Sequence, residues 1–143
     1  MKLIIINGPN LDLLGKREPG TYGHSSLSSI IETLRKDFPG HRIDHFQSNV
    51  EGELINDLHR ADGEYDAVVL NAGGYNHTSV ALTDAVAGID VPVLEVHLSN
   101  IYAREEFRRH SLLSPNCIGS ICGLGANVYH LAVQHFTAQV KSD

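Results

Sequence analysis

The sequence contains only two cysteines and no long apolar stretch, and each shortage excludes a class of protein. Cys117 and Cys122 have neither zinc-finger spacing nor the density of a disulfide scaffold, so we expect packing roles and a reducing compartment. The apolar run before Asn7 is too short for a signal peptide, and no stretch approaches the roughly 18 apolar residues of a membrane span. We therefore expect a soluble, cytoplasmic protein with no membrane partner.

Basic residues are also scarce. Eleven Lys and Arg residues face 17 Asp and Glu residues, which gives a formal net charge of −6, and no more than two basic residues occur in a row. This distribution excludes the electrostatic footprint of a nucleic-acid-binding protein, so anionic partners must be small and bound locally. The 143 residues with 42% hydrophobic content suit one domain, residues 1–143, with a sizeable core.

Short apolar runs bounded by Gly, Pro, Asn or Ser predict strands, most of them buried on both faces. They alternate with stretches in which apolar residues recur at helical spacing, at positions 27–34, 54–58, 80–86 and 128–135. Strands that alternate with helices predict an α/β fold, a three-layer sandwich around a five-stranded parallel sheet. The expected strands are Leu3 to Ile6, His41 to Gln47, Ala67 to Leu70, Val91 to Val96 and Cys117 to Cys122.

Polar clusters follow three of these strands directly. In an open parallel sheet, ligands bind beyond the carboxyl ends of the strands, so the three clusters should meet at one edge. Any one of them could instead serve a turn, and Ser79 could simply cap the next helix. Three such clusters together favour a binding site built from residues 7–10, 71–79 and 95–100.

Two nucleotide-binding motifs fail on inspection. The interval from Gly8 to Gly15 is too long for a phosphate-binding loop, and Arg17 stands where Ser or Thr is needed. The segment 123–125 begins a dinucleotide pattern, but Val128 replaces its third glycine. We expect no cofactor.

A metal site is disfavoured for a similar reason. His77 and His97, with Glu95 or Asp84, lack the spacing typical of metal ligands.

Tyr22 and Arg17 lie close enough in the sequence to meet within a bent loop, residues 8–23, whose Gly15, Gly20 and Gly23 predict a mobile lid. Ionising a tyrosine at neutral pH costs about 4 kcal/mol, because its ordinary pKa is near 10. A guanidinium about 4 Å away can offset a similar amount before desolvation is counted. The pair therefore suggests a tyrosinate base.

His97 and Glu95 stand two residues apart in a predicted strand and so share a face. A carboxylate near the imidazole, directly or through a water, fixes its tautomer and favours its protonated form, which suits a general acid. A base and an acid on one edge suggest proton abstraction at one carbon and protonation of a leaving group at the next. The predicted chemistry is β-elimination.

Four long, irregular strings resemble the type II 3-dehydroquinate dehydratases: INGPNLDLLGKREPGTYG, QSNVEGELI, LNAGGYNHTSVALTDAV and VLEVHLSNIYAREEFRRHS. The resemblance covers almost the whole chain and implies a flavodoxin-like fold, a homododecamer (a tetramer of trimers) and a role in the shikimate or quinate pathway. It implies conversion of 3-dehydroquinate into 3-dehydroshikimate and water by anti elimination through an enolate.

The resemblance also implies a role for each matching residue. Tyr22 matches the base, Arg17 the arginine that lowers its pKa, and Asn10 the residue that holds a water against the enolate. His97 matches the acid and Glu95 its orienting partner. The remaining matches concern the substrate: Asn71, Leu98 and Ser99 match the carboxylate pocket, His77 and Arg108 match ligands of the ring hydroxyls, Asp84 matches a contact from a neighbouring subunit, and Arg104 matches a secondary electrostatic support.

Asp84 and Arg104 also admit plainer interpretations. Asp84 could sit on an exposed helix face, and Arg104 could form a helical pair with Arg108 opposite Glu105 or Glu106.

Three positions depart from the pattern of many relatives: Ala72 replaces Pro, Gly74 replaces Ala, and Val50 replaces a common His. We expect a slightly looser loop after the third strand, with the chemistry kept.

Two other classes of protein remain as alternatives. A lysine Schiff-base dehydratase needs a desolvated amine, and none of the four lysines is an obvious candidate. A flavodoxin-like binding or signalling module would share the order of strands and helices. It would need a Ser/Thr-rich phosphate loop for FMN, or paired acids and a phosphorylatable Asp for signalling, but Asn10 and Asn71 occupy those places.

Overall fold

The computed structural model describes residues 1–16, 18–22 and 25–141, in which five parallel strands form one sheet. The strand order is β2-β1-β3-β4-β5, with Asn7 of β1 in register with both Gln47 and Asn71. This order is that of the flavodoxin-like fold, which confirms the predicted α/β class. The strands are β1 (Lys2–Asn7), β2 (Arg42–Gln47), β3 (Ala67–Asn71), β4 (Val93–His97) and β5 (Gly119–Cys122).

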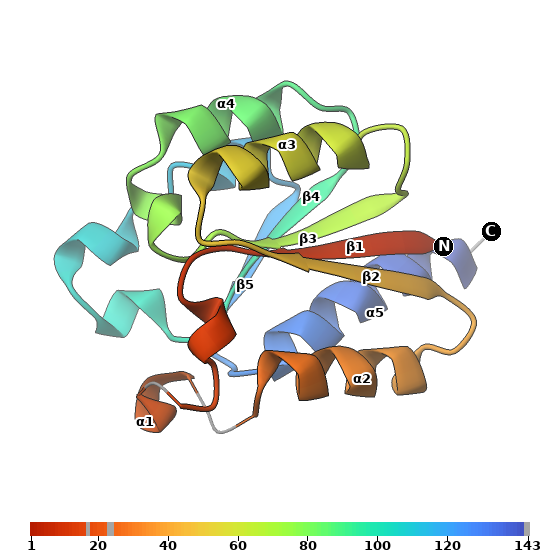
Figure 1. Cartoon of the computed structure of the whole chain (residues 1–143), viewed down its shortest axis with the longest axis horizontal. Coiled ribbons are helices and arrows are strands. Elements are labelled where there is room, and N and C mark those ends of the chain that lie inside the picture. The colour runs from red at the N-terminus through yellow and green to blue at the C-terminus, as the bar shows by residue number, and fades with distance from the viewer. Residues whose placement is uncertain (17, 23–24, 142–143) are drawn as a thin grey trace.

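Helices cover both faces of the sheet, so the molecule has three layers (Figure 1). Helices α2 (Leu27–Asp37) and α5 (Asn127–Lys141) pack on one face, and α3 (Glu51–Ala61) and α4 (Val80–Ala87) pack on the other. Each face has its own apolar core, because side chains of a strand alternate between faces. Leu3 and Ile5 belong to the first core, and Ile4 and Ile6 to the second. No helix in the described part of the chain is long and apolar enough to cross a membrane.

Burial explains why some strands were easy to predict. Every residue of β3 and β4 is buried, as expected for central strands of a parallel sheet. The edge strands β2 and β5 are mostly half-buried, and only Ile43 of β2 is fully buried. Their sequences therefore show a weaker apolar pattern.

Three predicted elements are displaced. Strand β5 begins at Gly119 rather than Cys117, after the 3₁₀ turn Ser114–Asn116. Strand β4 begins at Val93 rather than Val91, because Pro92 has no N–H to donate to a sheet. The apolar face of α5 is also shifted, since Tyr129 is fully buried whereas His135, predicted on that face, is exposed.

The connections at the carboxyl ends of the strands contain short helical turns that the apolar pattern did not predict. The loop after β1 contains a 3₁₀ turn, Leu11–Leu13, and the short helix α1 (Pro19–Tyr22). Leu11 and Leu14 are buried in the core on the α2 and α5 face. The first part of this loop is therefore anchored to the body of the protein. The other 3₁₀ turns are Gly73–His77, Ile101–Ala103, Glu106–Arg109 and Ser114–Asn116.

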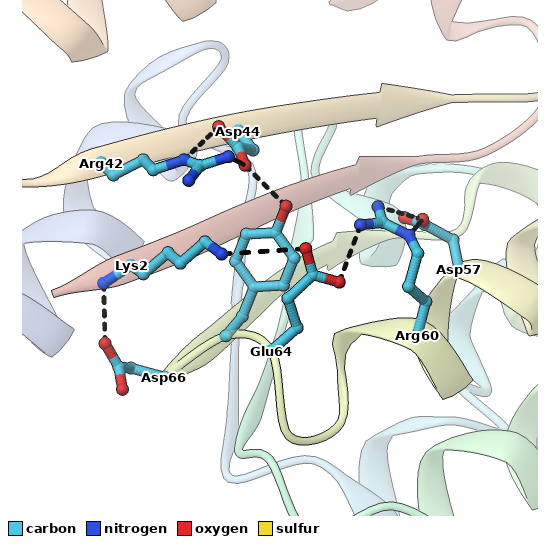
Figure 2. Close-up of polar contacts among 8 residues, drawn as sticks. Lys2, Arg42, Asp44, Asp57, Arg60, Glu64 and Asp66 are labelled. Atoms are coloured by element: carbon cyan, nitrogen blue, oxygen red, sulfur yellow. Dashed lines mark hydrogen bonds and ion pairs between the residues drawn. The ribbon is translucent and has the colours of Figure 1, made fainter.

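The opposite end of the sheet carries a network of ion pairs (Figure 2). Arg42 Nη2 lies 2.9 Å from Asp44 Oδ2, and Lys2 Nζ lies 3.7 Å from Glu64. Arg60 joins this network by contacting Glu64 at 3.1 Å. The network lies at the amino ends of β1 and β2, at the opposite end of the sheet from the expected ligand site.

Candidate active site

A cavity of about 110 Å³ opens at the carboxyl ends of β1, β3 and β4. This volume is far larger than one water needs, so the cavity can receive a small molecule. Residues from all three predicted polar clusters line this cavity, as expected because the three strands end at the same edge of the sheet. The predicted site residues among its lining are Asn10, Asn71, His77, His97, Leu98, Ser99, Arg104 and Arg108.

His97 forms part of the cavity wall, and its imidazole is held from behind by Glu95. Nε2 of His97 lies 2.7 Å from Glu95 Oε2, and both side chains are buried. The predicted pairing of these two side chains is therefore a direct contact. Because Nε2–H donates to the carboxylate, Nδ1 is the nitrogen left for a ligand.

Glu95 is held as an anion by its neighbours. Burial alone would raise the pKa of Glu95, but hydrogen bonds from His97 and Ser111 outweigh it, and the side chain of Asn76 adds to their effect, so the pKa falls below its ordinary value. Ser111 donates its hydroxyl to Glu95 Oε2 at 2.6 Å. The His97 ring therefore faces a buried carboxylate that is held in its charged form.

His77 is prepared for a different role. Its Nδ1–H donates to the backbone carbonyl of His110 at 2.8 Å, so the neutral ring keeps Nε2 as an acceptor. Burial lowers the pKa of His77 against the effect of that hydrogen bond, and the nearby His97 and Arg108 lower it further. The rings of His77 and His97 stack, with centroids 6.1 Å apart. His77 can therefore accept a hydrogen bond from a ligand hydroxyl.

The loops after β1 and β3 pack closely together. A Cβ at Gly8 would lie 2.5 Å from the carbonyl oxygen of Ala72, so only glycine fits there. Asn10 adopts a left-handed conformation with φ 70°, and its N–H donates to Asn49 Oδ1 at 2.9 Å. These contacts fix Asn10 at the cavity wall.

The peptide groups after β4 are also fixed. The carbonyls of His97 and Leu98 accept hydrogen bonds from the N–H groups of Gly123 and Gly125, at 3.1 and 3.0 Å. Gly123 has φ +90°, and a Cβ there would lie 3.2 Å from Asn100. The rigid backbone suits an anion site formed by N–H groups at residues 98–99.

Two arginines complete the wall. Arg104 Nη1 lies 3.4 Å from Ser99 Oγ, which places its charge beside the residue 98–99 segment. Arg108 forms an ion pair with Glu105 and lies over the ring of Phe107, with 5.0 Å to its centroid. The plainer interpretation of Arg104, a helical pair with Arg108, is wrong, because Arg104 follows the turn Ile101–Ala103 and Arg108 lies in the separate turn Glu106–Arg109.

Four predicted residues are not among the described lining of the cavity. Glu95 lies behind His97. Arg17 lies outside the described residues. Tyr22 ends α1, but the structure describes only its backbone. Asp84 is exposed on α4 and does not line the cavity.

The three residues that depart from the pattern of the resembled family differ in their surroundings. Ala72 is buried between the rim loops, Gly74 has open space where a Cβ would stand, and Val50 is exposed at the start of α3. Their effect on loop mobility stays a prediction. Ser79 does cap α4, by accepting the N–H of Leu82 at 2.9 Å.

The cysteines are also consistent with packing. Both are free, and Cys117 packs against the α3 and α4 core. Burial, followed by the negative charge of Glu95, raises the pKa of the Cys117 thiol to about 12. The thiol is therefore a poor nucleophile at neutral pH.

Metal and Schiff-base chemistry find no support in the described part of the chain. No three His, Cys, Asp or Glu side chains there are placed to hold a metal ion. No lysine is among the described residues that line the cavity.

Several supporting residues were missed by sequence reasoning. The hydroxyl of Ser111 contacts the Glu95 carboxylate and also Asn76 Oδ1. The hydroxyl of Tyr129 contacts Asn71. Tyr129 is distant in sequence from the strands it contacts, and no motif links it to them. A buried tyrosine hydroxyl was the one available signal, because such a group must find a partner.

Comparison with known proteins agrees with this geometry. Residues 1–137 match the family model described as dehydroquinase class II. The 3-dehydroquinate dehydratase of Proteus mirabilis (strain HI4320) is 51% identical over 134 residues, which cover 92% of this chain and 91% of the relative. That of Synechococcus sp. (strain CC9605) is 47% identical over 143 residues, covering 99% and 98%.

A comparison with solved structures also finds type II dehydroquinases. The type II dehydroquinase of Butyrivibrio crossotus DSM 2876 superposes with a TM-score of 0.93 at 36% identity, covering 96% of this chain and 97% of the other. Because residues 1–137 of this chain match the family model and a relative is 51% identical over 92% of the chain, the chain belongs to the class II dehydroquinase family.

Proposed function

We propose that this protein dehydrates 3-dehydroquinate to 3-dehydroshikimate and water, as a hydro-lyase of the shikimate or quinate pathway. The observation that carries the proposal is the buried contact between His97 and Glu95 at the cavity wall, 2.7 Å long. His97 lines the cavity with Glu95 behind it, which supports its role as the proton donor to the leaving hydroxyl. The family and the relatives' names identify the substrate.

The reaction begins with a base on the other side of the substrate. Tyr22, as a tyrosinate favoured by Arg17, removes a proton from the carbon next to the ketone, and the electron pair forms an enolate. Asn10 at the cavity wall holds a water that hydrogen-bonds to the enolate oxygen. The enolate then collapses, the carbon–oxygen bond breaks, and the departing hydroxyl takes a proton from His97 to leave as water.

The lid carries the base, and the strand ends carry the acid. Residues 8–23 form this lid, and the burial of Leu11 and Leu14 supports a moving part that begins after Leu14. Closure over the substrate then assembles acid and base around one bond and excludes water.

Substrate groups are distributed over the cavity wall. Asn71, the hydroxyl of Ser99 and the backbone N–H groups of Leu98 and Ser99 bind the carboxylate, with Arg104 as electrostatic support. His77 Nε2 and Arg108 bind the ring hydroxyls. The neutral state and backbone contact of His77 support this role.

We also infer a cytoplasmic homododecamer in which Asp84 reaches a neighbouring subunit's site. The exposed position of Asp84 on α4, away from its own cavity, supports a contact outside its own subunit. Sedimentation equilibrium of the purified protein gives the subunit number directly, and a monomer would contradict this assembly.

The function is tested by following the absorbance of the conjugated enone as 3-dehydroquinate is added to the purified protein. We expect turnover that persists when borohydride is added together with substrate, because no imine forms for it to reduce. Irreversible inactivation by borohydride would refute the tyrosinate mechanism, and absence of enone formation would refute the function.

A further inference from the structure

A buried chain of hydrogen bonds runs from the cavity wall to the edge strand β2. Asn71 Nδ2 lies 3.0 Å from the hydroxyl of Tyr129, which lies 2.5 Å from Asn7 Oδ1. Asn7 Nδ2 in turn lies 3.1 Å from His45 Nε2. The chain therefore connects β3, α5, β1 and β2, and only its His45 end is half-buried.

Which atom donates in each of these hydrogen bonds follows from the contact at the cavity end. The N–H of Gly73 can only donate, and it does so to Asn71 Oδ1 at 3.2 Å, so the other side of the amide is Nδ2. Nδ2 donates to the Tyr129 oxygen, which leaves the one hydroxyl hydrogen of Tyr129 for Asn7 Oδ1. Asn7 then presents Nδ2 to His45, so His45 Nε2 must accept and Nδ1 carries the proton.

Burial makes this order strict. Asn7 and Tyr129 are fully buried and Asn71 is 3% exposed, so water cannot replace a lost partner. Burial also raises the pKa of Tyr129, against the lowering effect of the Asn71 hydrogen bond, so its hydroxyl stays protonated and available to donate.

We propose that Tyr129 and Asn7 are positioning residues that hold the Asn71 amide in the orientation needed for substrate binding. This inference rests on the proposed function, because it gives Asn71 the task of binding the substrate carboxylate. The Nδ2 group has two hydrogens: one is fixed on Tyr129, and the other remains for the ligand. Without the Tyr129 hydroxyl, the 3.2 Å contact from the N–H of Gly73 is the one described hydrogen bond left to hold the amide, which can then rotate more readily and present its oxygen to an anion.

The kinetic test compares two isosteric substitutions that each remove a tyrosine hydroxyl. Tyr129→Phe breaks the chain, whereas Tyr65→Phe breaks a 2.6 Å hydrogen bond to Asp44 at the opposite end of the sheet. We expect Tyr129→Phe to raise KM about tenfold, the size of one hydrogen bond, with kcat changed less than about twofold. Tyr65→Phe should leave both constants within about twofold. An unchanged KM in Tyr129→Phe, or an equal rise in both variants, would overturn the proposal.

A double-mutant cycle tests whether Tyr129 acts through Asn71. In an Asn71→Ala background, Tyr129→Phe should cause no further rise in KM, because the group it positions is gone. A full, additive rise would show that Tyr129 acts by another route and would contradict the inference.

The tautomer of His45 gives a readout that needs no activity. Nitrogen-15 NMR of the unliganded protein, with the signal assigned by its loss in His45→Gln, should show a neutral ring protonated at Nδ1. Protonation at Nε2 would overturn the donor order. If the wild-type protein does not turn over 3-dehydroquinate, the proposed function is refuted. If the wild type is active and Tyr129→Phe has the same KM, only the positioning role is refuted.

Discussion

At the amino ends of β1 and β2 most charged groups are at least partly exposed, with Asp57 the buried exception, whereas at the carboxyl end of β4 His97 and Glu95 are both buried. The side chains of Arg42 and Asp44 are 62% and 27% exposed, but those of His97 and Glu95 are 7% and 1% exposed. Figure 2 shows the ion pairs of the amino-end network. Similar chemical groups thus occur at both ends of the sheet in opposite surroundings.

The difference in burial decides what each end can do. Water and salt screen an exposed ion pair, which therefore contributes little and tolerates rearrangement. A buried polar group must keep its partner, so its orientation and its ionisation state are specified. The buried end can hold a proton donor in place, and the exposed end contributes modestly to stability.

The largest effect is expected from Tyr22→Phe, which removes the hydroxyl that we propose as the base. We expect kcat to fall by about 10²- to 10⁴-fold, the usual contribution of a general base. Enone absorbance measures the rate, and the matched control is Tyr65→Phe, which removes a buried tyrosine hydroxyl at the opposite end of the sheet. Activity retained in Tyr22→Phe would refute the assignment of the base.

Glu95→Gln should have the next largest effect. The amide keeps the shape and can still accept from His97, but it removes the negative charge 2.7 Å from Nε2. We expect kcat to fall by roughly 10- to 100-fold, the worth of a hydrogen bond to a charged group. Equal kcat in the variant and wild type would show that the charge is not used.

The same substitution predicts a pH dependence of stability. The pKa of Glu95 is lowered in the folded protein from an ordinary value of 4.5, so its stabilising contribution is present above pH 4.5 and is lost as the pH falls through the folded value. Denaturant unfolding should therefore show wild type losing stability relative to Glu95→Gln only below about pH 4.5. A constant difference across that range would contradict the lowered pKa.

The smallest effect is expected at the amino end. Lys2→Met removes the contact with Glu64 and the cation over the Tyr65 ring, 4.9 Å from its centroid. We expect the free energy of unfolding to fall by less than about 1 kcal/mol, with a smaller difference at high salt. A larger loss that salt does not reduce would show that this end is not merely an exposed network.

Much of the fold was predictable because the apolar pattern is set by burial. Strands β1 and β3 are buried on both faces and read as continuous apolar runs, and α2 shows its buried face at helical spacing. The 3₁₀ turns at the carboxyl ends of the strands were not predictable in this way. Their residues are positioned by contacts within the loops, and these contacts leave no periodic apolar pattern in the sequence.

The site was predictable where function depends on residues close in sequence. Glu95 and His97 share a strand face, so two-residue spacing was enough to pair them. The chain from Asn71 through Tyr129 to Asn7 joins residues 58 and 122 positions apart, and no local pattern records such a contact. His45, the last member, reads in the sequence as an ordinary surface or packing histidine.

The comparison between the two ends of the sheet is tested most directly by kcat for His97→Ala measured beside Lys2→Met with 3-dehydroquinate. Loss of the proton donor should lower kcat by about 10²- to 10⁴-fold, while loss of the exposed cation should leave it unchanged. A His97→Ala variant that forms the enone as fast as Lys2→Met would contradict the central claim that the buried histidine delivers the proton.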